Sequence, residues 1–218
     1  MELAATIGLW WTPVLALIVV FRALGLSGLR PAWLAIAILV YAIYVVANME
    51  GDRLIPLEEW VGDLEWNWAG KLAAILSTVA VFIVLALTTK AVTRQSAGLT
   101  LRQAPGSVTP ALVMLAVLVA SAIALEILAA DGQSLGAERL AYQAAMPGID
   151  EELFYRGVFL AVLTAAVPSG RVNLLGARIG FAGLLVTLLF GLGQGHGGHG
   201  RVDARPAFAD CPGNQSFG

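Results

Sequence analysis

The sequence has little charge and almost no cysteine or histidine. Of its 218 residues only 13% are charged and 58% are hydrophobic, whereas a soluble domain carries about a quarter charged residues. The single cysteine, Cys211, excludes an intrachain disulfide and any cysteine-rich metal site. Because so few side chains suit a water-facing surface, the composition indicates a polytopic α-helical membrane protein.

Two classes of ligand are disfavoured by what the chain lacks. No basic stretch is interleaved with aromatic residues, so nucleic-acid binding is not expected. The glycine-rich run GLGQGHGG lacks the lysine and the preceding strand of a phosphate loop, which argues against nucleotide binding. No basic region precedes the first apolar run, which is therefore expected to stay as a membrane anchor.

About six apolar segments approach the roughly 20 residues that a helix needs to cross hydrocarbon. They are expected at residues 3–24, 32–48, 67–89, 109–130, 151–168 and 174–193. The odd-numbered connections between them are basic and the even-numbered ones acidic, so positive-inside placement predicts an outside N-terminus. The predicted fold class is all-α: a multi-pass transmembrane helix bundle over residues 1–193, surrounded by a lipid bilayer.

The stretch PGIDEELFYRG places three acids next to an apolar run. Because a Pro-Gly pair breaks the chain there, a helix is expected to begin at Asp150, with Asp150 as its N-cap. Glu152 and Arg156 are four residues apart on one face and can pair. Glu151 projects about 100° away from Glu152 and is expected to stay free, which suits a general base that takes a proton from water.

Acids in a first turn, with a basic residue one turn later, also occur in many helices for capping alone. On spacing this is the simpler interpretation. Two features favour a site: charge inside a membrane segment is expensive, and Gly157 beside Arg156 allows another element to pack closely. Glu126 is the main other charge within a segment, and its simpler interpretation is a residue near a helix end that reaches the interface.

The pattern Glu151-Glu152-x-x-x-Arg156-Gly157, in this apolar context, resembles the first motif of the CPBP intramembrane metalloprotease family, over residues 110–195. That family includes the CaaX prenyl endopeptidases and bacterial proteins of bacteriocin processing and self-immunity. The resemblance implies hydrolysis of a peptide bond in a membrane-associated peptide or protein substrate, in a bacterial cytoplasmic membrane. It also implies that Glu151 activates water and that Glu152 and Arg156 orient it.

The family's second and third motifs, FxxxH and HxxxN or HxxxD, supply histidines for a metal that is usually taken to be zinc. Here Phe190 is followed four residues later by Gln194, a poor metal ligand, so His196 is the candidate ligand or electrophile. His199 and Asp203 match HxxxD literally, but they lie in a glycine-rich tail without helical periodicity, and we interpret that match as coincidence. Two histidines are few for a zinc site, which usually takes three or four protein ligands.

The apolar periodicity ends near Leu192, and residues 194–218 are expected to form an irregular glycine-rich tail. Because no later membrane helix carries the third motif, a truncated or frameshifted end is expected. Two further functions stay open. One is a non-catalytic membrane immunity or scaffold protein that has lost the full catalytic set, and the other is a small transporter that uses Glu126 and the acidic cluster as proton carriers.

Overall fold

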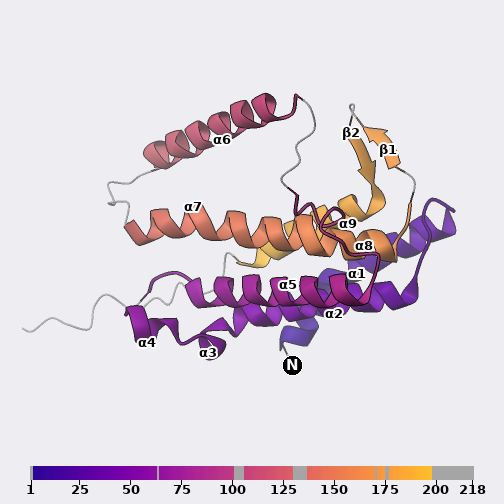
Figure 1. Ribbon diagram of the computed structural model, residues 1–218, viewed down its shortest axis with the longest axis horizontal. Coiled ribbons are helices and arrows are strands. Elements are labelled where there is room, and N and C mark those ends of the chain that lie inside the picture. Colours follow the sequence, from indigo (N-terminus) through magenta and orange to yellow (C-terminus); the bar gives the residue numbers. More distant parts are fainter. Residues whose placement is uncertain are drawn as a thin grey trace, which may run out of the picture.

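The computed structural model describes residues 2–62, 64–100, 106–129, 137–169, 171–174 and 177–197. This part of the chain is mostly helical, which agrees with the all-α part of the prediction (Figure 1). In chain order the elements are α1 (Glu2–Ala23), α2 (Pro31–Met49), α3 (Gly51–Leu54), α4 (Leu57–Val61), α5 (Trp68–Thr88), α6 (Val108–Ala129), α7 (Ala137–Glu151), the π-helix η1 (Glu152–Phe159), α8 (Leu160–Ala166), β1 (Arg171–Leu174), β2 (Ala177–Gly180) and α9 (Phe181–Gly197).

A short antiparallel hairpin, β1 with β2, precedes the last helix. It pairs Arg171 with Gly180 and Leu174 with Ala177. Polar and apolar residues alternate along β1, a period typical of a strand and not of a helix. The apolar segment expected from residue 174 therefore begins as a helix only at Phe181, and the prediction was wrong over its first residues.

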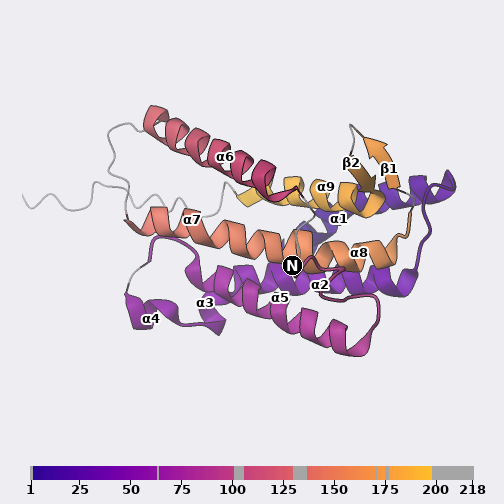
Figure 2. The same ribbon diagram turned by 45° about the horizontal axis from the view of Figure 1, so that its top comes forward.

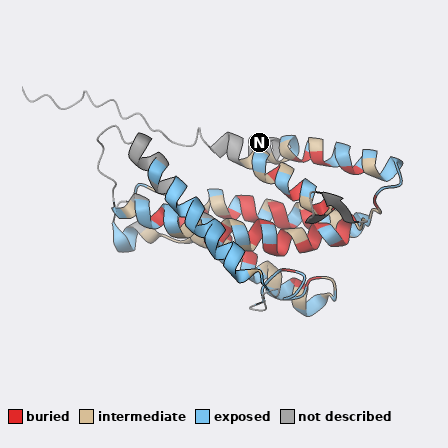
Figure 3. Ribbon diagram, turned by 90° about the horizontal axis from the view of Figure 1, so that it is seen from above, coloured by how far each residue is buried: buried red, intermediate tan, exposed pale blue. Residues whose placement is uncertain are grey.

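Within the described residues, two helices are long and apolar enough to cross a membrane: α2 and α5. The apolar stretches Ile7–Ala23, Val108–Ser121 and Phe181–Gly193 are shorter. Large apolar side chains lie exposed on these helices, among them Val19 and Leu87, which are 66% and 82% exposed (Figure 3). Contiguous apolar surface of this kind is rare on soluble monomers. It supports membrane association, although only these two of the expected spans meet the criteria of length and composition.

Small residues bring α5 close to the end of α2. A methyl group on Gly51, at the start of α3, would overlap the backbone of Gly70, and one on Gly70 would overlap the Asn48 carbonyl. Glycine is therefore required at both positions if the backbones are to approach this closely. The contact fixes the first turn of α5, and Lys71 follows directly in that turn.

Aromatic rings fill the core between α1, α2 and η1. Trp11 lies edge-on to Tyr41 at 5.8 Å and to Phe159 at 6.2 Å between ring centroids. Phe154 of η1 stacks on Tyr44 of α2 at 3.7 Å. Edge-to-face and stacked rings at these distances add to the stabilisation from apolar burial. The π-helix therefore lies in the packed centre of the molecule and not at its edge.

The two ends of the bundle differ in charge. At one end, the backbone N–H of Gly28 donates to the Pro168 carbonyl at 2.7 Å, which joins the α1–α2 turn to the end of α8. At the other end, the Glu138 carboxylate of α7 accepts from the Glu65 backbone N–H at 3.1 Å (Figure 2). Arg22 in the last turn of α1 and Arg30 at the start of α2 flank the first connection. The connection from α2 to α5 instead carries Glu50, Asp52, Glu58, Glu59, Asp63 and Glu65 with Arg53.

Candidate active site at the acidic turn

The acidic motif lies inside a helical stretch that runs without a break from α7 through η1 to α8. The prediction that a helix begins at Asp150 was wrong, because α7 begins at Ala137 and continues past the Pro-Gly pair to Glu151. Proline removes only one backbone donor, and local widening of the helix can satisfy the freed groups. A π-helical segment follows at Glu152, and π-type irregularities are frequent at functional sites.

Asp150 is the buried centre of this region. Its side chain is 0% exposed, and its Oδ2 atom accepts hydrogen bonds from the Tyr44 hydroxyl at 2.8 Å and from Lys71 Nζ at 2.7 Å. Its Oδ1 atom is buried without a hydrogen-bond partner. The three side chains come from α7, α2 and α5, so a single carboxylate links three helices. A buried carboxylate is costly unless it is paired.

Lys71 was missed by the sequence analysis, although a signal for it exists. It is the single charged residue in the apolar helix Trp68–Thr88, and a lone charge in a membrane-length segment marks a site. Its side chain is 14% exposed. The amine therefore lies largely out of water, beside carboxylates of the acidic turn, which we define as Asp150, Glu151 and Glu152.

Glu151 lies next to this pair and is not free, contrary to the prediction. Its Oε1 atom is 3.6 Å from Lys71 Nζ, and its side chain is 23% exposed. One ammonium group therefore faces two neighbouring carboxylates, those of Asp150 and Glu151. The Glu151 carboxylate is partly withdrawn from solvent, at the junction of α5, α7 and η1.

The predicted pair of Glu152 and Arg156 is confirmed. Arg156 Nη1 lies 2.8 Å from Glu152 Oε1 and 3.1 Å from Oε2, as the four-residue spacing indicates. The two side chains are 55% and 76% exposed. Exposed pairs of this kind contribute about 0–1 kcal/mol. Glu152 thus points to a different environment from Glu151, although the two are adjacent.

All four tyrosines of the chain lie around the acidic turn. Tyr44 donates to Asp150, and burial raises the pKa of Tyr142 to about 12, with Asp150 and Glu151 adding to the shift. The Tyr41 and Tyr155 hydroxyls lie together against α9, because a methyl group on Gly193 would be 4.0 Å and 3.6 Å from them. These hydroxyls give an otherwise apolar region a polar lining.

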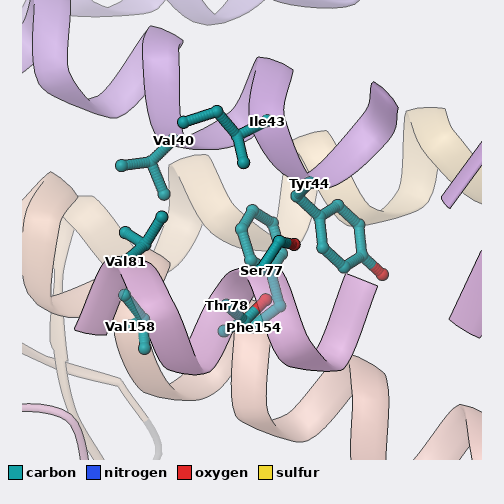
Figure 4. Close-up of a pocket in the computed structure, with 8 residues that line it drawn as sticks. All are labelled: Val40, Ile43, Tyr44, Ser77, Thr78, Val81, Phe154 and Val158. Carbon is teal, nitrogen blue, oxygen red and sulfur yellow. The ribbon is translucent and has the colours of Figure 1, made fainter. Parts of the chain in front are cut away.

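An apolar seam lies next to the site, and it is lined by Val40, Ile43, Tyr44, Ser77, Thr78, Val81, Phe154 and Val158. Figure 4 shows side chains of α2, α5 and η1 meeting there, with the Tyr44 hydroxyl directed away from them. Thr78 lines the seam, but its hydroxyl donates to the Ala74 carbonyl of its own helix at 2.7 Å. The seam is therefore apolar in character, and it holds the Tyr44 ring so that only its hydroxyl reaches the acidic turn.

Phe190, the residue where the resemblance places a second motif, contacts the helix that carries the acidic motif. The Phe190 ring lies edge-on to Tyr155 at 5.1 Å between centroids, which places α9 against η1. The backbone of residues 194 and 196 continues α9 as far as Gly197. The side chains of Gln194, His196 and Glu126 lie outside the described residues, as do His199 and Asp203 altogether.

Comparisons with protein-family models, with characterised proteins and with solved structures found no significant match.

Proposed function

We propose that this protein is a multi-pass intramembrane endopeptidase of the CPBP type, in which Glu151 activates water to cut a membrane-associated peptide or protein. The setting of Glu151 carries the proposal: its carboxylate is 23% exposed and lies 3.6 Å from a lysine that a buried aspartate holds. A carboxylate withdrawn from water at a helix junction is well placed to act as a general base.

In this mechanism each residue has a separate task. Glu151 takes a proton from water, and the water oxygen attacks the carbonyl carbon of the scissile peptide bond. The C–N bond then breaks, and the proton passes from Glu151 to the leaving amine. Lys71 is a positioning residue, since Asp150 fixes the ammonium that faces Glu151. Glu152 and Arg156, in the first and last turns of η1, keep the supporting role that the resemblance implies.

The described donors do not by themselves fit a zinc ion. Asp150 Oδ2 is taken by Tyr44 and Lys71, and the ammonium would repel a dication beside Glu151. Among the residues that the structure describes, no three His, Cys, Asp or Glu side chains form a group that could hold a metal. Zinc with His196 as a ligand stays a prediction of the resemblance, and no step above passes through it.

The placement in a membrane is part of the same proposal. With α2 and α5 as spans, the other apolar helices complete a bundle of about six spans in a bacterial cytoplasmic membrane. The end that carries Arg22 and Arg30 faces the cytoplasm, because basic connections are retained on that side. The acidic connection from α2 to α5 then faces outward.

The test is cleavage by the purified full chain in liposomes, with lipid-anchored fluorogenic peptides as substrates. Glu151→Gln should lower the rate by about 100-fold or more, since a general base contributes roughly that much. Glu59→Gln, an exposed glutamate on α4, is the matched control and should cleave like the wild type. Cleavage that Glu151→Gln leaves unchanged would remove Glu151 from the mechanism.

A second candidate function is a non-catalytic membrane immunity or scaffold protein, and α6 favours it. Its large side chains with described exposure lie open on every face, from 49% at Val119 to 60% at Leu112, and α6 lies apart from the other helices in Figure 1. A helix that is apolar all round is normally covered by lipid or by a partner. This second function would be favoured if the wild-type protein cleaves no peptide and if the wild type and the Glu151→Gln variant protect cells equally well.

A further inference from the structure

A hollow of about 490 Å³ lies at the basic end of the bundle, and none of the residues that line it belongs to the acidic turn. The end of α1 and the turn that follows it form one side with Arg22, Leu26 and Ser27. The chain that follows α8 forms the other side with Pro168 and Ser169. The turn is held in place, because Gly28 and Arg30 donate backbone hydrogen bonds to Pro168 and Ala166. The hollow is therefore a fixed feature of the fold and not a gap beside a loose end.

Two polar side chains that line this hollow, those of Arg22 and Ser27, have no hydrogen-bond or ion-pair partner among the described residues. Ser27 is only 5% exposed, yet its hydroxyl is buried without a hydrogen-bond partner. Such a group carries the full cost of its lost hydration. Arg22, in the last turn of α1, is exposed. By contrast, the Ser169 hydroxyl is already used, because it accepts from the Phe181 backbone N–H at 3.1 Å.

Arg22 and Ser27 both line this hollow, and an arginine together with a serine suits a phosphate group. Arginine presents its N–H groups in a planar fork that matches phosphate oxygens, and a serine hydroxyl can donate to a third oxygen. Leu24 and Leu26, on the same turn, are 65% and 56% exposed. The next element is α2, one of the two membrane-length helices. Apolar side chains beside a cationic pocket at the end of such a helix match the junction between a lipid headgroup and its acyl chains.

We infer that this hollow binds a phosphate group through Arg22 and Ser27, with an anionic phospholipid headgroup or free phosphate as its source. The inference is independent of peptide hydrolysis, since it involves neither Glu151 nor the residues around it. Failure of one proposal therefore leaves the other intact.

The test measures binding to the purified full chain in a neutral detergent, by thermal stabilisation over a ligand titration. The probes are short-chain phosphatidylglycerol, inorganic phosphate, and a short-chain diacylglycerol that lacks the phosphate. The variants are Arg22→Gln and Ser27→Ala, with Arg94→Gln as the control, because Arg94 is an exposed arginine that does not line the hollow. Circular dichroism checks that each variant is folded.

Phosphatidylglycerol should bind, Arg22→Gln should weaken it about tenfold, and Ser27→Ala should weaken it about threefold, as expected for a charge-assisted and a neutral hydrogen bond. Arg94→Gln should bind as the wild type does. The same dependence on Arg22 with inorganic phosphate alone would support the site and assign free phosphate as the source. Equal binding of the diacylglycerol, or equal losses in Arg22→Gln and Arg94→Gln, would overturn the inference. Ser27→Ala keeps the charge, so it tests the site even if the arginine variant folds poorly.

Discussion

Two ion pairs of the same charge type belong to the acidic turn, and they differ in their surroundings. Lys71 and Asp150 are 79 residues apart in sequence, and their side chains are 14% and 0% exposed. Arg156 and Glu152 are four residues apart, and their side chains are 76% and 55% exposed. Water screens the second pair, whereas each member of the first pair depends on the other to offset the cost of burial.

This difference shows which charge fixes the site. The exposed pair is the one that spacing predicts, but its loss leaves both charges in water. Local sequence spacing does not predict the buried pair of Lys71 and Asp150. This pair connects α5 to α7, and Asp150 holds the ammonium group that faces Glu151.

Removing the buried ammonium should have the largest effect on stability. Lys71→Met leaves the buried Asp150 carboxylate without a countercharge, and breaking a buried ion pair in this way costs about 3–5 kcal/mol. The free energy of unfolding in detergent measures the loss. The double variant Lys71→Met with Asp150→Leu removes both charges and should recover part of it. A single variant as stable as the wild type would show that the pair is not buried as described.

The glycine contact that positions Lys71 should come next. Gly70→Ala places a methyl group against the Asn48 carbonyl, and forcing extra volume into a packed contact costs about 1–3 kcal/mol. Gly191→Ala on α9, where nothing lies within 4 Å of the added methyl group, is the matched control. Equal stabilities for the two variants would argue against the close approach of α5 to α2.

The Tyr44 hydroxyl should contribute less than the lysine. Tyr44→Phe keeps the ring stacked on Phe154 and removes one of the two hydrogen bonds to Asp150 Oδ2. A hydrogen bond to a charged group is worth about 1.5–3 kcal/mol, and the retained Lys71 should keep the loss near the lower value. Thermal unfolding measures it. A loss as large as that of Lys71→Met would mean that the hydroxyl, and not the ammonium, is the main partner of Asp150.

Breaking the exposed pair should have the smallest effect. Arg156→Gln should change the free energy of unfolding by no more than about 1 kcal/mol, and salt should reduce the difference further. Unfolding at low and high salt gives both quantities. A salt-independent loss of several kcal/mol would contradict the exposure of this pair.

The predictable part of the fold was the part set by local sequence. Helical class follows from composition, and the Glu152–Arg156 pair follows from a spacing of four residues. The helix start at Asp150 was predicted from Pro147 and Gly148, but α7 begins at Ala137 and continues through both residues, where it packs against α5. The hairpin before α9 was missed because its strands are only four residues each.

The candidate site was predictable only in part, for a related reason. Glu151 and Glu152 stand out because three acids are adjacent, but the partner of Glu151 lies on another helix. That contact depends on the approach of Gly70 to the end of α2, which no local pattern reports. The sequence does show that Lys71 is the single charged residue of an apolar helix. That observation identifies Lys71 as a candidate site residue, but it does not predict which carboxylates pair with it.

The adjacent glutamates give the most direct test of the central claim, that the partly buried carboxylate and not the exposed one carries the chemistry. The measurement is the single-turnover cleavage rate of a lipid-anchored peptide by Glu151→Gln and by Glu152→Gln in liposomes of the same composition. We predict a loss of about 100-fold or more for Glu151→Gln and a much smaller loss for Glu152→Gln. Equal rates for the two variants, or a larger loss for Glu152→Gln, would contradict the account.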